Sequence, residues 1–222
     1  MRGVFLATTL VLGCVPTTQG RDTTGGTDER QPAGTIYRLH FDSSSPGVLP
    51  ADGELIIILG GWAIDDELGA PSAPNVLRQT EARYPDEYPR AVVRDRVFEK
   101  LSLKAKCRID AGETHPACGL MFRFQDSRNY MVAWMGVPEQ EVHLVLVKDG
   151  VREEMARSVA TVQVGRWHDL EVRATPLETV IKLDGQTVLS NNNSSFVRGK
   201  VGVWSESDTT VSFDDFEARE LE

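Results

Sequence analysis

Two neighbouring runs of the sequence place sugar-binding types of side chain at alternate positions, as on one face of a β-strand. The first run ends with Arg123 and Gln125, and the second contains Tyr130 and Trp134. If the polar segment 126–129 forms the turn of a hairpin, alternation puts the four side chains on one surface. Aromatic rings would stack on sugar rings there, and planar donors would bind hydroxyl or carboxylate oxygens. An ordinary half-exposed sheet has the same mixture, so the structural alternative stays open.

The other face of the predicted hairpin is apolar throughout. The expected cross-strand pairs are Phe124 with Met131, Phe122 with Ala133 and Leu120 with Met135. This face is therefore predicted to lie in the core. His143 begins the next strand-like run and is a further candidate for the surface that holds Trp134.

The acidic, serine and histidine residues of the sequence do not occur at the spacings of known catalytic motifs. The sequence has no E-x-D-x-x-E run, as on the catalytic strand of family 16 glycoside hydrolases, and no G-x-S-x-G or phosphate-binding loop. Its four histidines show no H-E-x-x-H or other paired spacing. We therefore assign no catalytic residue.

The N-terminus reads as an export signal. Arg2 precedes a short apolar run, and Val11-Leu12-Gly13-Cys14 resembles the bacterial lipobox, in which the cysteine is acylated and becomes the mature N-terminus. We predict a lipoprotein signal peptide over residues 1–13 and lipidation of Cys14, with an ordinary signal peptide as the alternative. Several acyl chains on one cysteine give a stable membrane anchor.

Lipidation of Cys14 would leave two of the three cysteines, Cys107 and Cys118. They lie in two strand-like runs around a polar segment, and a hairpin would bring them together. In an exported protein we predict a disulfide, which would close a loop of about a dozen residues and stabilise the fold by about 3 kcal/mol. The alternative is two buried free thiols.

The amino-acid composition divides the rest of the chain into a polar segment and a domain with a hydrophobic core. Residues 14–35 are almost free of large apolar side chains and are predicted to be a flexible tether, followed by one domain over residues 36–222. That domain contains about a dozen short strand-like runs, with hairpin dipeptides at Asp149-Gly150 and Asp184-Gly185. The best helix candidate, Thr80–Arg83, is at most one turn. We predict an all-β fold with two packed antiparallel sheets.

The order of these runs resembles the concanavalin A-like lectin/glucanase superfamily, the laminin-G-like jelly roll. The segments that carry the resemblance cover nearly all of residues 36–222; they are Phe41-Asp42, Gly61–Ile64, Gly119–Trp134, Gly165–Val172, Ile181–Gly185, Gly199–Trp204 and Val211–Phe216. The pattern is also similar to the bacterial group around 3-keto-disaccharide hydrolases. The resemblance implies a β-sandwich with its ligand on the concave sheet. It also implies a structural Ca²⁺ where the first and last strands meet, for which Asp42 and Asp214 are the candidates and ordinary edge aspartates the alternative.

The net charge and the predicted export signal restrict the classes of partner that the protein can have. Twenty-four basic and thirty-three acidic side chains give a net charge of −9, which disfavours nucleic acid. We expect a lipid-anchored protein of the bacterial cell envelope, facing the periplasm or the surface, that binds oligo- or polysaccharides without cleaving them. The alternatives are a glycoside hydrolase or lyase acting on a modified (3-keto) disaccharide, and a structural envelope protein that contacts another protein.

Overall fold

The computed structural model describes residues 30–49, 54–192 and 195–222. The predicted signal peptide, the lipidation site Cys14 and the predicted tether as far as residue 29 lie outside these residues. Residues 30–35 already contact the domain, because Gln31 N–H donates to the Val97 carbonyl and Gly34 N–H to that of Glu220. The described part of the chain contains no helix, and so none that could cross a membrane.

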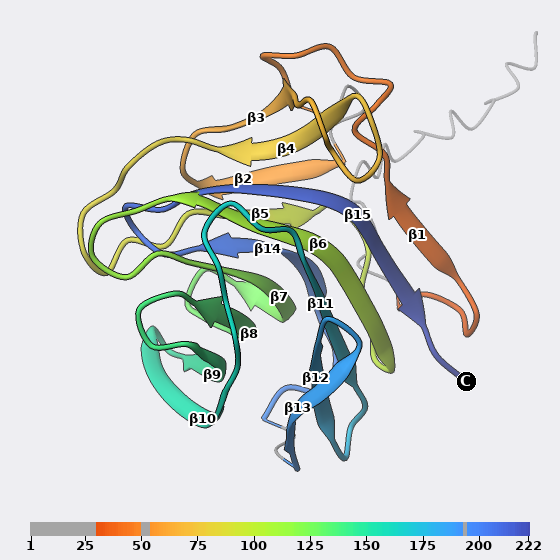
Figure 1. The fold of residues 1–222 in the computed structure, drawn as a ribbon. Helices are drawn as coiled ribbons and strands as arrows, with labels where there is room; N and C mark the ends of the chain where they lie inside the picture. Colours follow the sequence, from red (N-terminus) through yellow and green to blue (C-terminus); the bar gives the residue numbers. More distant parts are fainter. Residues whose placement is uncertain (1–29, 50–53, 193–194) are drawn as a thin grey trace, which may run out of the picture.

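Within the described residues, fifteen strands form two antiparallel sheets, and a sandwich of two such sheets is what the sequence predicts (Figure 1). The eight-stranded sheet runs in the order β13 (Gln186–Asn191), β12 (Thr179–Leu183), β11 (His168–Ala174), β6 (Leu101–Ala111), β15 (Thr210–Glu220), β4 (Asn75–Gln79) and β3 (Trp62–Asp66), with β1 (Ile36–Leu39) also paired to β15. The seven-stranded sheet runs in the order β10 (Val151–Val159), β9 (Glu141–Lys148), β8 (Asn129–Gly136), β7 (Ala117–Asp126), β14 (Lys200–Ser205), β5 (Arg90–Val93) and β2 (Leu55–Leu59). The edge strands β10 and β13 contact each other, so the sheets meet along that side.

Turn chemistry fixes the hairpins that flank the later strands. Asp149-Gly150 and Asp184-Gly185 both take positive φ at each residue, the backbone that two-residue hairpins require. The predicted turn after β7 also forms, since Asp126 pairs with Asn129 and the Asp126 carboxylate accepts the Arg128 N–H at 2.7 Å. The predicted helical turn Thr80–Arg83 is wrong: these residues follow β4 as irregular backbone.

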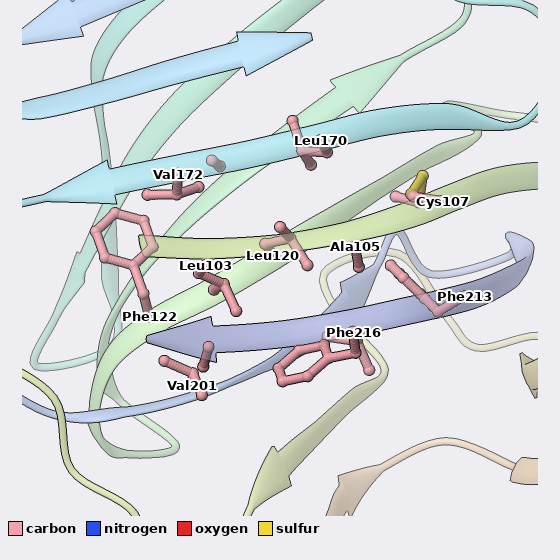
Figure 2. Close-up of a cluster of buried hydrophobic side chains, with 14 of the residues drawn as sticks. Leu103, Ala105, Cys107, Leu120, Phe122, Leu170, Val172, Val201, Phe213 and Phe216 are labelled. Carbon is pink, nitrogen blue, oxygen red and sulfur yellow. A yellow bond between two sulfur atoms is a disulfide. The ribbon is translucent and has the colours of Figure 1, made fainter. Parts of the chain in front are cut away.

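The core fills the space between the two sheets. Figure 2 shows side chains from both sheets meeting there; they include Leu103, Ala105, Leu170, Val172, Phe213 and Phe216 from the eight-stranded sheet and Leu120, Phe122 and Val201 from the seven-stranded one. All are essentially fully buried. Burial of apolar surface at this level is the main stabilising contribution to such a sandwich.

Cys107 and Cys118 form the predicted disulfide. The prediction that a hairpin brings them together is wrong, because β6 and β7 belong to different sheets. The bond crosses the core instead, with both cysteines fully buried. It therefore fastens one sheet to the other at the point where the chain passes between them.

Candidate functional site

The predicted hairpin exists, but a bulge shifts its pairing. Leu120 pairs with Ala133 and Phe122 with Met131, whereas the pairing returns to the predicted register at Asp126 and Asn129. The shift falls at Arg123, whose φ of 51° breaks the alternation of β7. Because the shift is two residues, Leu120 and Phe122 keep the core face that alternation predicts.

The bulge overturns two of the predicted positions. Phe124 was expected in the core but packs on the outer face of the seven-stranded sheet, against Tyr130 with ring centres 6.2 Å apart. Arg123 was expected on that outer face but turns inward and is 2% exposed. Its Nη2 donates to the Thr175 carbonyl and its Nη1 lies 3.8 Å from Met131 Sδ. Burial lowers the pKa of Arg123 to about 10.

Gln125 and Tyr130 do not present free side chains to a ligand. The Gln125 amide donates to the Arg123 carbonyl at 3.0 Å and to that of Arg198, so it holds the bulge. Tyr130 lies on the predicted face but is 1% exposed, and its hydroxyl accepts a hydrogen bond from Arg90 at 2.7 Å. The phenol is therefore not available to stack on a sugar.

Trp134 and His143 lie where alternation predicts, on the outer face of the seven-stranded sheet. They belong to a line of directly paired positions across neighbouring strands of this sheet: Arg157, His143, Trp134, Gly119, Trp204 and Arg90. We call this line the aromatic row. Gly119 makes it compact, since a Cβ there would lie 2.7 Å from Trp134 Cβ.

The rings of the aromatic row stack against one another. The Trp134 and His143 rings are 3.8 Å apart and within 6° of parallel, and the Trp134 and Trp204 ring centres are 6.1 Å apart. Since β9 and β14 lie on opposite sides of β8, the two faces of Trp134 are turned towards these neighbours. The ring thus offers its edge, rather than a face, to the outside.

The seven-stranded sheet curves around its outer face. Arg152 on β10 and Tyr88, two residues before β5, are five strand spacings apart, about 24 Å in a flat sheet. Yet the Arg152 guanidinium lies 4.0 Å from the centre of the Tyr88 ring and 5.6 Å from that of Trp204. We therefore call this surface the concave face.

Acidic groups line one end of the concave face. A pocket of about 190 Å³ there is lined by residues that include Asp86, His115, Glu206 and Asp208. Burial raises the pKa of Glu206, against the opposing effect of Arg152. By contrast the pKa of Asp208 is lowered, since the backbone N–H groups of Thr114 and Glu113 outweigh its desolvation.

His143 has acidic neighbours of its own. Its Nδ1 lies 2.9 Å from the Glu154 carboxylate, and its Nε2 lies 3.3 Å from that of Glu141 without the alignment of a hydrogen bond. Arg157 pairs with both carboxylates at longer distances. At this end of the aromatic row, His143 and Arg157 thus share two carboxylates.

The two calcium candidates have protein partners. Asp214 accepts hydrogen bonds from Ser72 N–H and Oγ and from Asp215 N–H, all at 2.7 Å. Asp42 accepts one from Asn75 N–H at 3.2 Å. Within residues 30–49, 54–192 and 195–222 no three His, Cys, Asp or Glu side chains are grouped to hold a metal ion. A calcium site at Asp42 and Asp214 stays a prediction.

A second pocket lies on the other sheet. It has a volume of about 560 Å³ and is lined by charged side chains of β1, β6, β11 and β15. Several of these already pair: Lys106 with Asp169, and Arg38 with Glu217, both at 2.6 Å. No residue predicted from the sequence as a ligand contact lies there, and the paired charges are typical of a solvated sheet surface.

Four residues of the concave face were not predicted from the sequence: Tyr88, Arg90, Arg152 and Glu206. Tyr88 and Glu206 lie in connecting segments, and Arg152 belongs to a strongly charged edge strand. The face on which Trp204 lies could have been predicted, because Val201 and Val203 point into the core and Trp204 alternates with them along β14.

Comparison with solved structures supports the fold. A carbohydrate-binding module, CBM66 from Bacillus subtilis, superposes with a TM-score of 0.64 at 18% identity, over 75% of this chain and 96% of that one. A Bacillus subtilis protein of unknown function with a galectin-like fold gives 0.55 at 9% identity, over 75% and 89%. The GH43 protein BlXynB from Bacillus licheniformis gives 0.54 at 14% identity, over 79% of this chain and 41% of that one. At these identities the similarity establishes a jelly-roll sandwich of the kind predicted, and no more. No protein-family model and no curated protein sequence matches the chain.

Proposed function

We propose that the protein is an exported, lipid-anchored glycan-binding module that holds an oligo- or polysaccharide on the concave face. The observation that carries the proposal is the aromatic row, which brings Trp134 and Trp204 together across the middle of a curved sheet. Arginines and a carboxyl group surround the row, and such groups bind sugar hydroxyls in a fixed geometry. The lipid on Cys14 would hold this face at a membrane of the cell envelope, in the periplasm or at the surface.

The folds of the similar structures agree with this proposal. One of them is a carbohydrate-binding module, 96% of which superposes on this chain, and another has a galectin-like fold. Fold alone does not assign function, so the proposal depends on the residues of the concave face. It retains Trp134 and His143 from the sequence prediction and replaces Arg123, Gln125 and Tyr130 with Tyr88 and Arg152, which pack against the buried ring of Trp204.

Binding of the purified full-length chain to a glycan array tests the proposal. Trp134→Ala should weaken binding of the best glycan about thirtyfold, as expected when a central aromatic anchor worth about 2 kcal/mol is removed. Trp167→Ala is the matched control, because Trp167 packs with Arg108 on the other sheet. Circular dichroism and thermal melting should show both variants folded.

Two outcomes would contradict the proposal. One is a folded Trp134→Ala protein that binds glycans as tightly as the unaltered chain does. The other is a full-length chain that binds no glycan on the array; this would favour the remaining alternative, a structural envelope protein whose sheet contacts another protein.

A glycoside hydrolase is the second candidate, favoured by Glu206. A half-buried carboxyl with a raised pKa beside an aromatic site is suited to donate a proton to a leaving sugar oxygen. The expected substrate would be the modified (3-keto) disaccharide implied by the sequence resemblance. If the protein is an enzyme of this kind, Glu206→Gln should abolish sugar release while leaving binding in place. Absence of sugar release by the unaltered chain across 3-keto and ordinary disaccharides would exclude this candidate.

A further inference from the structure

The Arg152 guanidinium is held without any polar partner among the described residues. It donates no hydrogen bond and has no carboxylate within ion-pairing distance, although Glu206 lies near enough to act on it electrostatically. Its contacts are the rings of Tyr88 and Trp204. A guanidinium normally uses its fork of N–H groups to bind carboxylate or phosphate oxygens, so this one is poised for an external acceptor.

Arg152 is one of several unpartnered donors around Trp204. Near Trp204 the buried polar atoms without a partner among the described residues are Nη1 of Arg152, Nε of Arg90 and Nε1 of both Trp134 and Trp204. Trp204 itself is fully buried. The remaining such atoms among the described residues of this face are Nε2 of His143, which has the Glu141 carboxylate 3.3 Å away, and, in the pocket at the acidic end, Nε of Arg83 and Oδ1 of Asp208. Around Trp204 the unpartnered atoms are therefore all donors, whereas the acidic groups of the concave face lie at its two ends.

This excess of unpartnered donors around Trp204 favours some classes of sugar over others. A hydroxyl group both donates and accepts, and so needs acceptors as well as donors from its site, whereas a carboxylate or a sulfate ester only accepts. The aromatic row adds to the preference because the edge of an aromatic ring carries partial positive charge. We infer that the bound glycan is acidic and that its anionic group docks on Arg152, beside the edges of Trp134 and Trp204.

Binding requires Arg152 to move, because it covers the ring of Trp204 in the unbound chain. Its side chain extends from β10, an edge strand most of whose residues are partly or fully exposed. Leaving Tyr88 breaks no hydrogen bond. The net charge of −9 opposes acidic ligands only weakly, since salt screens charges beyond about 8 Å at physiological ionic strength.

The inference rests on the proposed function and is tested with matched ligands. The probes are oligogalacturonides against their methyl esters, and a sulfated galactan against its desulfated form, titrated into the full-length chain. At least one acidic member of the two pairs should bind at least about tenfold more tightly than its neutral counterpart, and which one does identifies a carboxylate or a sulfate as the group.

Substitutions of Arg152 test whether this residue causes the preference for acidic glycans. Arg152→Gln should abolish the preference for the acidic member, while Arg152→Lys, which keeps the charge and loses the fork, should retain part of it. Arg173→Gln is the matched control for charge, because Arg173 is exposed on β11 of the other sheet. It should leave the preference unchanged.

The outcomes separate this inference from the function on which it rests. If glycans bind on the concave face but neutral and acidic members bind equally, the inference is wrong and the proposed function stands. If Arg152→Gln keeps the preference, the inference is also wrong. If no glycan binds, the proposed function fails and the inference fails with it.

Discussion

Single residues determine what the concave face can offer a ligand. Gly119 lies between the two tryptophans of the aromatic row, and any larger residue would place a Cβ 2.5 Å from the Ala133 carbonyl oxygen. Its absence of a side chain lets Trp134 and Trp204 approach across β7. The same close stacking turns the ring faces inward, so the N–H groups and ring edges carry the polar chemistry.

Arg123 provides a test of the bulge at the residue scale. It is a buried cation with no carboxylate partner, and burying an unpaired charge costs several kcal/mol. Arg123→Met should therefore leave the free energy of unfolding unchanged or raise it, and should not affect glycan binding. A fall in the thermal midpoint of more than about 4 °C, about 1 kcal/mol for a chain of this size, would show that Arg123 is needed where it lies.

Alternation predicted the faces of β8 but not the course of β7. The side chains of Tyr130, Met131 and Trp134 all point as a period of two requires. The bulge had no sequence signal, because an arginine at positive φ is unusual and nothing around it in the sequence marks a kink. Arg123 and Gln125 were therefore assigned to the ligand surface, whereas one is buried and the other stabilises the bulge.

At the scale of elements, the hairpin of β12 and β13 is fastened to β11 by Asp184. Its carboxylate accepts the Asp169 N–H at 2.9 Å and lies 2.9 Å from His168 Nδ1. Desolvation raises the pKa of Asp184, but these contacts outweigh it, and the pKa is below its ordinary value. The ionised group therefore stabilises the fold above about pH 4, and this contribution is lost as the pH falls through the folded-state pKa.

Asp184→Asn measures that contribution. Asparagine tolerates the positive φ of this turn position, so the change removes the charge and keeps the backbone. The variant should melt at a lower temperature than the unaltered chain at pH 7, and the difference should shrink at pH 3. A difference that is the same at both pH values would mean that ionisation of Asp184 does not stabilise the hairpin.

The disulfide between β6 and β7 acts on both sheets at once. It joins residues 11 apart in the sequence, and closing such a loop in the unfolded chain is worth about 3 kcal/mol. Replacing both Cys107 and Cys118 with alanine should lower the free energy of unfolding by about 2–3 kcal/mol in denaturant titrations. The folded fraction should keep its β-type circular dichroism and its glycan binding, because Cys118 points into the core, on the face of β7 opposite the aromatic row. Free thiols that alkylate before reduction of the exported protein would contradict the bond itself.

Most strands were predictable, and those that were missed share a physical reason. The strand-like runs Thr179–Leu183 and Lys200–Ser205 of the sequence match β12 and β14 residue for residue, because turn signals lie close to their ends. The strands β3, β4 and β10 were not predicted. β10 is an exposed edge strand rich in charge, and the sequences of β3 and β4 carry polar ends that read as loops.

At the scale of the whole molecule, the β-sandwich follows from composition and turn spacing, and its concave surface does not. A single sequence indicates which residues face outward along each strand, but not how strongly a sheet curves. Curvature brings Arg152 and Tyr88 together from opposite sides of the seven-stranded sheet. This is why only part of the candidate site could be predicted.

Anchoring also belongs to the scale of the whole molecule. The lipidation site Cys14 lies outside the described residues and stays a prediction from the sequence. Cys14→Ala should move the protein from the membrane fraction to the soluble envelope fraction, since the acyl chains would be its anchor. A variant that still sediments with membranes and incorporates labelled palmitate would rule out Cys14 as the site.

The position of a bound sugar is the most decisive measurement for a glycan-binding concave face. A crystal structure of the full-length chain with its best-binding oligosaccharide should show the sugar at the edges of Trp134 and Trp204, with Arg152 turned from Tyr88 towards the ligand. The rival location is the pocket of about 560 Å³ on the eight-stranded sheet. An oligosaccharide bound there, with the aromatic row unchanged and uncontacted, would contradict the proposed site.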